Sequence, residues 1–133
     1  MIYLDTSVII SFVDEMDVNH DVAKRLLEEY NDDKIVSWLT VVELSSVYSR
    51  ADMKSSPSLA LYSIRKVGAE IVDLDMNELL REAFRLSPML KLRTLDLLHI
   101  SACKIANCGF FMTLDNGIKS SSKEIGMLGI KVI

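Results

Sequence analysis

The chain has 133 residues, which fits one domain, and 50% of them are hydrophobic, enough to bury a core and to exclude a disordered chain. No stretch approaches the roughly 20 apolar residues of a membrane-spanning helix, and the start lacks the features of a signal peptide, so we expect a cytoplasmic protein without membrane contact. The formal net charge of −4 argues against general affinity for nucleic acid through bulk electrostatics, although local basic patches remain open.

The first elements in chain order alternate between strand and helix. Residues 2–5 are apolar and β-prone, and 19–30 place apolar residues at helical spacing behind a possible cap at Asn19. A second strand is predicted at 34–38. A second helix follows from Thr40, which can cap it.

The most polar stretch of the chain, residues 49–58, is predicted to be a loop. Ser56 and Pro57 then indicate the cap and first position of a third helix, which Gly68 ends. The run AEIVDLD, residues 69–75, predicts a third strand.

The last third continues the same alternation. A helix capped by Asn77 is predicted to stop where Ser87-Pro88 interrupts it, and another helix is predicted over 94–107. Strands are predicted at 110–114 and 129–133, with a short Ser-rich segment between them.

Short apolar strands that alternate with helices are typical of a parallel sheet covered on both faces. The pattern therefore predicts an α/β fold, a three-layer α/β/α sandwich with a five-stranded parallel sheet, as a single domain over 1–133. In such sheets ligands bind outside the carboxyl ends of the strands, where the winding reverses.

Two aspartates stand at such strand ends in matching contexts. Asp5 in IYLDTSVI and Asp115 in FMTLDNGI each follow an apolar strand and precede small polar residues. If the first and fourth predicted strands flank the reversal point, the two carboxylates become neighbours. The alternative is that each aspartate only caps the helix after its strand.

Two more acids fall among apolar neighbours on predicted helices. Glu43 shares a helical stripe with Leu39 and Val47, and Asp96 is surrounded by leucines. A buried acid is rare unless it is paired or bound to metal. The alternative for both is a first-turn acid favoured by the helix dipole. His99, three residues after Asp96, would point near it or into the core; we expect a core histidine, and the alternative is a catalytic one.

Carboxylates that converge repel one another, and a divalent cation removes that conflict. Oxygen ligands with no nearby His or Cys select Mg²⁺ or Mn²⁺ over zinc, and a phosphate ester is the natural partner of such an ion. The two cysteines, Cys103 and Cys108, read as buried free thiols.

At this point the motifs LDTSVI, TVVEL, LDLLHISA and TLDNGI resemble, in order and approximate spacing, the four acidic motifs of PIN-domain ribonucleases, most closely the small VapC-type toxins of toxin–antitoxin pairs. The resemblance implies an acidic pocket of Asp5, Glu43, Asp96 and Asp115. It also implies Mg²⁺-dependent endoribonuclease cleavage of single-stranded RNA, homodimerisation, and a cognate antitoxin peptide across the active-site groove.

The resemblance implies a role for each motif residue. Asp5 and Asp96 would hold the metal directly, Asp115 would complete its shell or a second site, and Glu43 would orient or deprotonate the attacking water. Ser7 and Thr113 would be supporting hydroxyls. Hydrolysis would leave a 5′-phosphate and a 3′-hydroxyl. Many relatives carry a further acid after the fourth motif, whereas residues 116–118 here are Asn-Gly-Ile, so one metal ion is the expectation.

Arg50, Lys54, Lys91 and Arg93 neighbour the second and third acidic motifs and are candidates for RNA binding; the alternative is a solvated charged surface. Two other functions stay open. One is a catalytically inactive PIN-like scaffold. The other is a receiver-like Mg²⁺-binding signalling module, although no suitable Lys follows the fifth strand. No Gly-rich dinucleotide fingerprint follows the first strand.

Overall fold

A computed structural model describes residues 1–133 and contains one sheet of five strands in the order β3-β2-β1-β4-β5. All neighbouring strands are parallel. The predicted five-stranded parallel sheet is thus confirmed. The strands are β1 (Ile2–Leu4), β2 (Lys34–Ser37), β3 (Ala69–Val72), β4 (Phe110–Met112) and β5 (Lys131–Val132).

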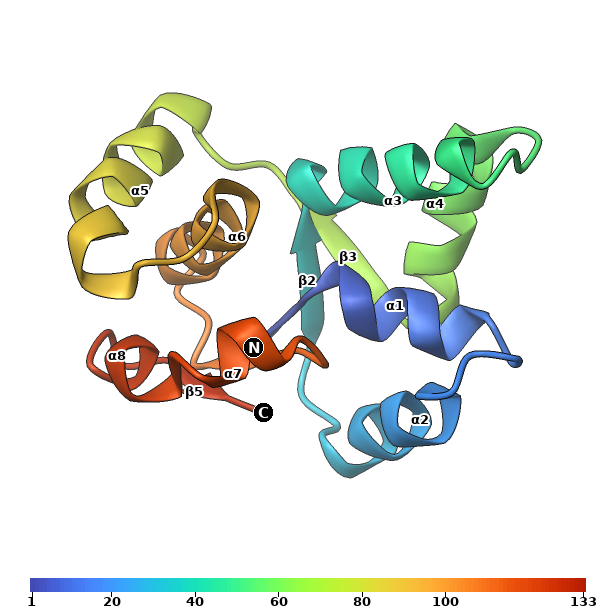
Figure 1. Cartoon of the computed structure of the whole chain (residues 1–133), viewed down its shortest axis with the longest axis horizontal. Coiled ribbons are helices and arrows are strands. Elements are labelled where there is room, and N and C mark those ends of the chain that lie inside the picture. The colour runs from blue at the N-terminus through green and yellow to red at the C-terminus, as the bar shows by residue number, and fades with distance from the viewer.

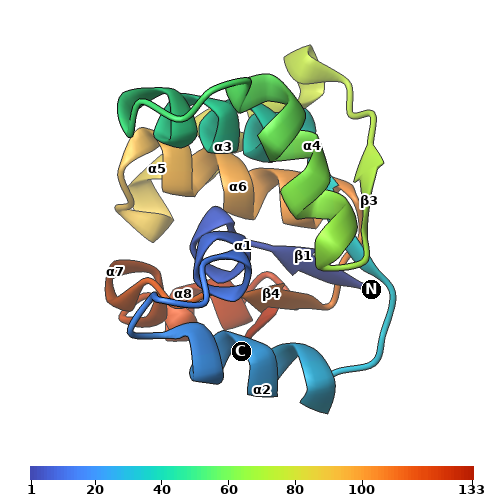
Figure 2. The same cartoon turned by 90° about the vertical axis from the view of Figure 1, so that its right-hand side faces the viewer.

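Helices cover both faces of this sheet, as the prediction of three layers requires (Figures 1 and 2). On one side lie α1 (Thr6–Val13), α2 (His20–Glu29), α3 (Trp38–Arg50) and α4 (Ser56–Lys66), and on the other lie α5 (Met76–Leu90), α6 (Thr94–Ile105), α7 (Asn116–Lys119) and α8 (Ser122–Gly126). None of these helices is long and apolar enough to cross a lipid bilayer.

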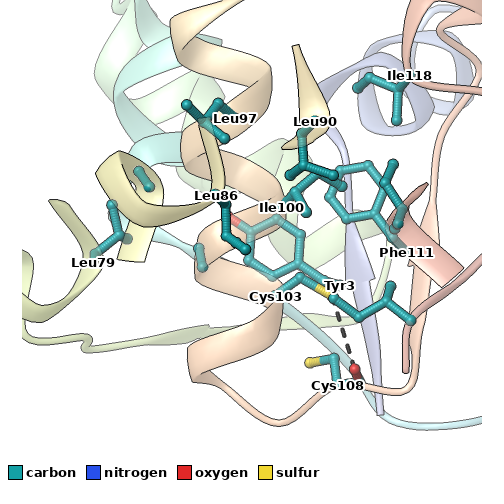
Figure 3. Close-up of a cluster of buried hydrophobic side chains, with 14 of the residues drawn as sticks. Tyr3, Leu79, Leu86, Leu90, Leu97, Ile100, Cys103, Cys108, Phe111 and Ile118 are labelled. Atoms are coloured by element: carbon teal, nitrogen blue, oxygen red, sulfur yellow. Dashed lines mark hydrogen bonds between the residues drawn. The ribbon is translucent and has the colours of Figure 1, made fainter. Parts of the chain in front are cut away.

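The alternation of side chains along the strands divides the core into two. Ile2 and Leu4 point into the cluster beneath α1–α4, whereas Tyr3 points into the cluster beneath α5 and α6. Figure 3 shows Tyr3 beside Phe111, with side chains of α5 and α6 packed over both rings. Burying an aliphatic side chain contributes roughly 1.5–3 kcal/mol, so each cluster fixes the helices on its face.

The strand order places the reversal of winding between β1 and β4. From β1 the chain moves outward through β2 to β3, and it then returns to the other side of β1 with β4 and β5. The carboxyl ends of β1 and β4 therefore lie side by side, in register from Ile2 and Phe110 onward. A receiver-type sheet has the order 2-1-3-4-5, with its third strand central, whereas β3 here is an edge strand.

Two predicted helix boundaries are wrong at the start of their helices. α3 begins at Trp38 with Ser37 in the N-cap position, so Thr40 is a buried helical residue instead of a cap. α5 begins at Met76, and its cap is Asp75, whose carboxylate accepts the N–H of Glu78 at 3.0 Å. Strand β2 is therefore shorter than predicted, because its last residue turns directly into the helix.

The predicted stop of α5 at Ser87-Pro88 is also wrong, since the helix continues to Leu90. Pro88 has no N–H to give to the carbonyl of Phe84, but the hydroxyl of Ser87 donates to that carbonyl at 2.9 Å. The helix ends instead at Lys91, which has a left-handed backbone with φ of 52°. The serine thus replaces the hydrogen bond that the proline removes.

The C-terminal elements also differ in detail from the prediction. The Ser-rich segment before β5 contains two short helices, α7 and α8.

Two smaller predictions concern other parts of the chain. Ser55 rather than Ser56 occupies the N-cap position of α4. Cys103 and Cys108 are buried free thiols, as predicted.

Candidate active site

A pocket of about 770 Å³ opens at the carboxyl ends of β1 and β4. All four predicted acids line it, although they come from positions 5, 43, 96 and 115. β1 and β4 bring in the first and last, while α3 and α6 bring in the other two from opposite faces of the sheet. The pocket lining includes Asp5, Thr6, Ser7, Trp38, Glu43, Arg50, Arg93, Asp96 and Asp115.

Asp5 is held by two hydroxyl groups. Its Oδ2 accepts hydrogen bonds from Ser7 Oγ and Thr113 Oγ1, each at 2.7 Å, and the residue is only 5% exposed. It stands at the N-cap position of α1 but makes no capping bond, so capping does not explain this carboxylate. Because both bonds use Oδ2, the other oxygen is left without a protein partner.

Asp115 has both of the roles that the sequence left as alternatives. Its Oδ1 accepts the N–H groups of Gly117 at 2.7 Å and Ile118 at 3.3 Å, which caps α7. The same residue lines the pocket. As in Asp5, one carboxylate oxygen is held by the protein and the other remains for a ligand.

Asp96 lies in the first turn of α6 and is affected by the other aspartates. Its pKa is raised, first by burial and then by the negative charges of Asp115 and Asp5, while Arg93 opposes the shift. Arg93 Nε is 3.7 Å from Asp96 Oδ2. The charges of Asp5 and Asp115 therefore act on Asp96.

Glu43 lies in the second turn of α3, beyond the first turn in which the helix dipole would explain an acid. Burial raises its pKa, but contact with His99, the nearby Thr6 hydroxyl and the charge of Arg50 outweigh that effect, so the pKa is lowered. His99 Nε2 is 3.5 Å from Glu43 Oε1. Glu43 therefore keeps its negative charge at neutral pH.

The four predicted RNA-binding residues divide into two pairs. Arg50, the last residue of α3, and Arg93, just before α6, both line the pocket and are exposed. Lys54 lies in the loop after α3, and Lys91 ends α5; both are exposed and outside the pocket lining.

The sequence does not favour a site role for two residues, Trp38 in the pocket lining and His99 next to Glu43. Trp38 was assigned to a strand, but it begins α3 half-exposed at the pocket, where its Nε1 donates to Asp73 Oδ1 at 2.8 Å. His99 is indeed in the core, yet it also reaches Glu43. The signal for His99 was its position one helical turn after Asp96, which directs both side chains to one face.

A compact group of possible cation ligands includes His99, whereas the sequence predicts oxygen ligands with no nearby His. Asp5, Glu43 and His99 each offer a ligand atom, and these atoms lie within 4.8 Å of one another. Asp96 and Asp115 are outside this compact group but line the same pocket. His99 Nδ1 contacts Tyr3 and its Nε2 faces Glu43, so carboxylate oxygens are the donors left for an ion. Mg²⁺ typically uses one or two carboxylates and keeps several waters.

Comparison with known proteins identifies the same architecture elsewhere. A family model described as PIN domain matches residues 2–123. No curated protein is similar enough in sequence to match the chain.

Solved structures of toxins share the fold over nearly the whole chain. VapC20 of Mycobacterium tuberculosis, described as a Sarcin-Ricin loop cleaving toxin, is 14% identical, with a TM-score of 0.73 over 91% of this chain and 95% of that chain. VapBC2 of Rickettsia felis, bound to a DNA fragment from its promoter, is 20% identical, with a TM-score of 0.69 over 99% and 98%. A toxin–antitoxin complex from Klebsiella pneumoniae is 15% identical, with a TM-score of 0.69 over 98% and 95%.

Proposed function

Because the chain belongs to the PIN-domain family, we propose that it is a metal-dependent endoribonuclease that cleaves single-stranded RNA. The observation that carries this proposal is a single pocket lined by acids from four distant parts of the chain, Asp5, Glu43, Asp96 and Asp115. Asp5 and Asp115 raise the pKa of Asp96 inside one pocket, and the first two each keep a carboxylate oxygen that no protein group uses.

Asp5, Asp96 and Asp115 would hold Mg²⁺ or Mn²⁺, with bound waters filling the remaining positions. When bound, the ion would supply a Lewis acid that polarises the phosphoryl oxygen and acidifies water. The hydroxyls of Ser7 and Thr113 keep Asp5 turned toward the pocket. One metal ion is proposed, since no acid follows Asp115 on α7.

Glu43 is the proposed acceptor of the proton from the attacking water. Its lowered pKa keeps the carboxylate ionised, and its position on α3 places it at the pocket wall. The water oxygen bonds to phosphorus, the bond from phosphorus to the 3′-oxygen breaks, and that oxygen takes up a proton. The products would be a 5′-phosphate and a 3′-hydroxyl.

Arg50 and Arg93 are the proposed phosphate contacts, because they carry positive charge at the pocket of a chain whose net charge is −4. Lys54 and Lys91 would extend this contact along the RNA outside the pocket. The indole of Trp38 offers a surface on which an unpaired base can stack, which favours single-stranded substrate.

A role as the toxin of a toxin–antitoxin pair is the biological part of the proposal. The solved structures with the same fold include a toxin–antitoxin complex and VapBC2. By analogy, this chain would form a homodimer and be inhibited by a cognate antitoxin whose peptide crosses the pocket. Its substrate would then be RNA in the cytoplasm.

The experiment is cleavage of an end-labelled single-stranded RNA by purified protein with Mg²⁺, with EDTA, and with the Asp5→Asn variant. Asp32→Asn, which changes an exposed aspartate far from the pocket, is the matched control. We expect cleavage only with Mg²⁺ and only by the wild type and the control. Cleavage that persists in EDTA or in Asp5→Asn contradicts the mechanism, and a wild type without activity supports a PIN-like scaffold.

A further inference from the structure

A chain of buried polar side chains runs from the middle of the sheet to the pocket. Ser37 Oγ is 2.7 Å from the hydroxyl of Tyr3, and that hydroxyl is 3.0 Å from His99 Nδ1. On the other side of the ring, His99 Nε2 is 3.5 Å from Glu43 Oε1. Ser37 is 3% exposed, and Tyr3 and His99 are fully buried.

The packing around this chain leaves its members little freedom. The ring of Tyr3 stacks on Phe111, with 5.6 Å between centroids, and meets the imidazole of His99 edge-on at 5.8 Å. Figure 3 shows Tyr3 and Phe111 enclosed by side chains of α5 and α6. His99 itself is one helical turn after Asp96 on α6, so the helix that carries a proposed metal ligand also carries this imidazole.

The proton positions in this chain follow from its Glu43 end, because a carboxylate can only accept a hydrogen bond. An ordinary tyrosine hydroxyl is protonated at neutral pH, so Tyr3 can donate its proton to His99 Nδ1, 3.0 Å away. In the opposite arrangement, Nδ1 would carry the proton and Nε2 would turn a lone pair toward the Glu43 carboxylate. Two acceptors facing each other would leave the buried Nε2 without the hydrogen bond that it needs.

His99 Nε2 otherwise has no partner. It is buried without a hydrogen bond of normal length, and Glu43 is its nearest carboxylate. A contact of 3.5 Å is longer than an ordinary hydrogen bond, but such bonds around a catalytic group are often long without substrate and shorten in the complex. The carboxylate of Glu43 ends a long side chain that rotates freely unless a donor fixes it.

We propose that His99 is a positioning residue for Glu43: Ser37 and Tyr3 hold the imidazole in the tautomer with its proton on Nε2, and this N–H directs the Glu43 carboxylate toward the attacking water. The catalytic consequence rests on the proposed nuclease function. The tautomer of His99 does not depend on that function, so the tautomer and the nuclease function can be refuted separately.

The tautomer can be measured directly, because the chain has 2 histidines. His20 is the internal reference, since its Nδ1 contacts the carbonyl of Ser11 at 3.1 Å, and a carbonyl only accepts, so His20 carries its proton on Nδ1. In a long-range ¹H–¹⁵N spectrum at pH 8, where an ordinary imidazole is neutral, we expect opposite patterns: Nδ1–H for His20 and Nε2–H for His99. A His99 that carries its proton on Nδ1 overturns the proposal.

Loss of the tyrosine hydroxyl should change His99 and catalysis together. Tyr48→Phe is the matched control, because Tyr48 is also buried with its hydroxyl 2.8 Å from a serine, Ser63, on the other face of the sheet. We expect Tyr3→Phe to lower kcat by about 10-fold at an unchanged KM and to mix the two tautomers of His99. Tyr48→Phe should do neither.

Changes at His99 itself separate positioning from packing. Gln can place an N–H near the position of Nε2, whereas Leu fills space without a donor. We expect His99→Gln to retain several-fold more kcat than His99→Leu. Equal kcat for these two variants, or equal kcat for Tyr3→Phe and Tyr48→Phe, overturns the proposal. A wild type that cleaves no RNA but shows Nε2–H on His99 refutes the nuclease function and leaves the hydrogen-bonded chain in place.

Discussion

The carboxylates of Asp5 and Asp115 each divide their oxygens between the protein and the pocket. Hydroxyl groups hold one oxygen of Asp5, and backbone N–H groups hold one oxygen of Asp115. A carboxylate fixed in this way needs no reorientation when a cation arrives. Both residues are identifiable from their apolar strand context. The sequence does not show which oxygen of Asp5 the protein holds, because that depends on the hydroxyl of Thr113, just after β4.

Gly117 protects the position of Asp115. A Cβ at residue 117 would lie 2.9 Å from Asp115 Oδ1, and the backbone there has no left-handed strain. We predict that Gly117→Ala displaces the carboxylate and weakens Mg²⁺ binding by about 10-fold, a loss of the kind seen when the partners of a metal ligand change. Isothermal titration with Mg²⁺ or Mn²⁺ measures this effect.

Gly126→Ala is the control for that variant, because an added Cβ there would have no heavy atom within 4 Å. It should bind the ion like the wild type. If Gly117→Ala and Gly126→Ala bind equally well, the capped position of Asp115 is not needed for the site.

His99 shows where residue-level prediction stops. An imidazole on an apolar helical stripe indicates a core position, and His99 is fully buried. Its contact with Glu43 depends on how α3 and α6 meet at the end of the sheet from opposite faces, which no local pattern encodes. Trp38 is predicted in a strand, but the strand ends at Ser37 and Trp38 begins the next helix.

At the scale of elements, α5 anchors the helix that carries Asp96. Glu82 Oε1 on α5 is 2.7 Å from Lys104 Nζ on α6 and 2.5 Å from Arg85 Nη2 on its own helix. Hydrogen bonds from Arg85 and Lys104 lower the pKa of Glu82 to about 2. The contact between Glu82 and Lys104 joins α5 to the C-terminal part of α6, whereas the contact with Arg85 lies within α5.

The lowered pKa of Glu82 makes a prediction about acid stability. A carboxylate whose folded pKa lies below its unfolded value of 4.5 stabilises the fold above that pH, and the contribution is lost as the pH falls toward about 2. We predict that Glu82→Gln lowers the free energy of unfolding by about 1 kcal/mol at pH 7, a modest figure because Arg85 is largely exposed. Urea unfolding at pH 7 and pH 3 measures it.

The difference between wild type and Glu82→Gln should be smaller at pH 3 than at pH 7. Glu78→Gln, on the same helix and without an ion pair, is the control. A difference that is the same at both pH values would mean that Glu82 contributes through packing instead of charge.

Element types were more predictable than element ends. All five strands and the long helices from α2 to α6 lie close to their predicted ranges, because apolar periodicity determines them. The ends depend on single hydrogen bonds. Pro88 is accommodated inside α5 because the hydroxyl of Ser87 donates to the carbonyl of Phe84. The N-cap positions of α3 and α5 are Ser37 and Asp75 instead of the predicted Thr40 and Asn77.

At the scale of the whole molecule, topology explains why distant residues meet. The rule that ligands bind where the winding reverses requires only the strand order, and β1 beside β4 satisfies it. This predicted the meeting of Asp5 and Asp115. Glu43 and Asp96 join them because α3 and α6 approach the same edge of the sheet from opposite faces. Right-handed crossovers predict this approach, but the sequence does not specify how each helix is rotated about its axis.

The site should destabilise the protein when no cation is bound. Burial and repulsion from Asp5 and Asp115 raise the free energy of charged Asp96, so Asp96→Asn should be more stable than the wild type without metal. A cation that binds only the folded state should reverse this order.

Thermal unfolding of the wild type and Asp96→Asn, each with EDTA or saturating Mg²⁺ and with Asp32→Asn as control, tests the central claim most directly. We predict that Mg²⁺ raises the Tm of the wild type and of Asp32→Asn by roughly 3–6 °C and leaves Asp96→Asn unchanged. An equal rise in all three proteins, or no rise in the wild type, would contradict a cation site formed by these aspartates.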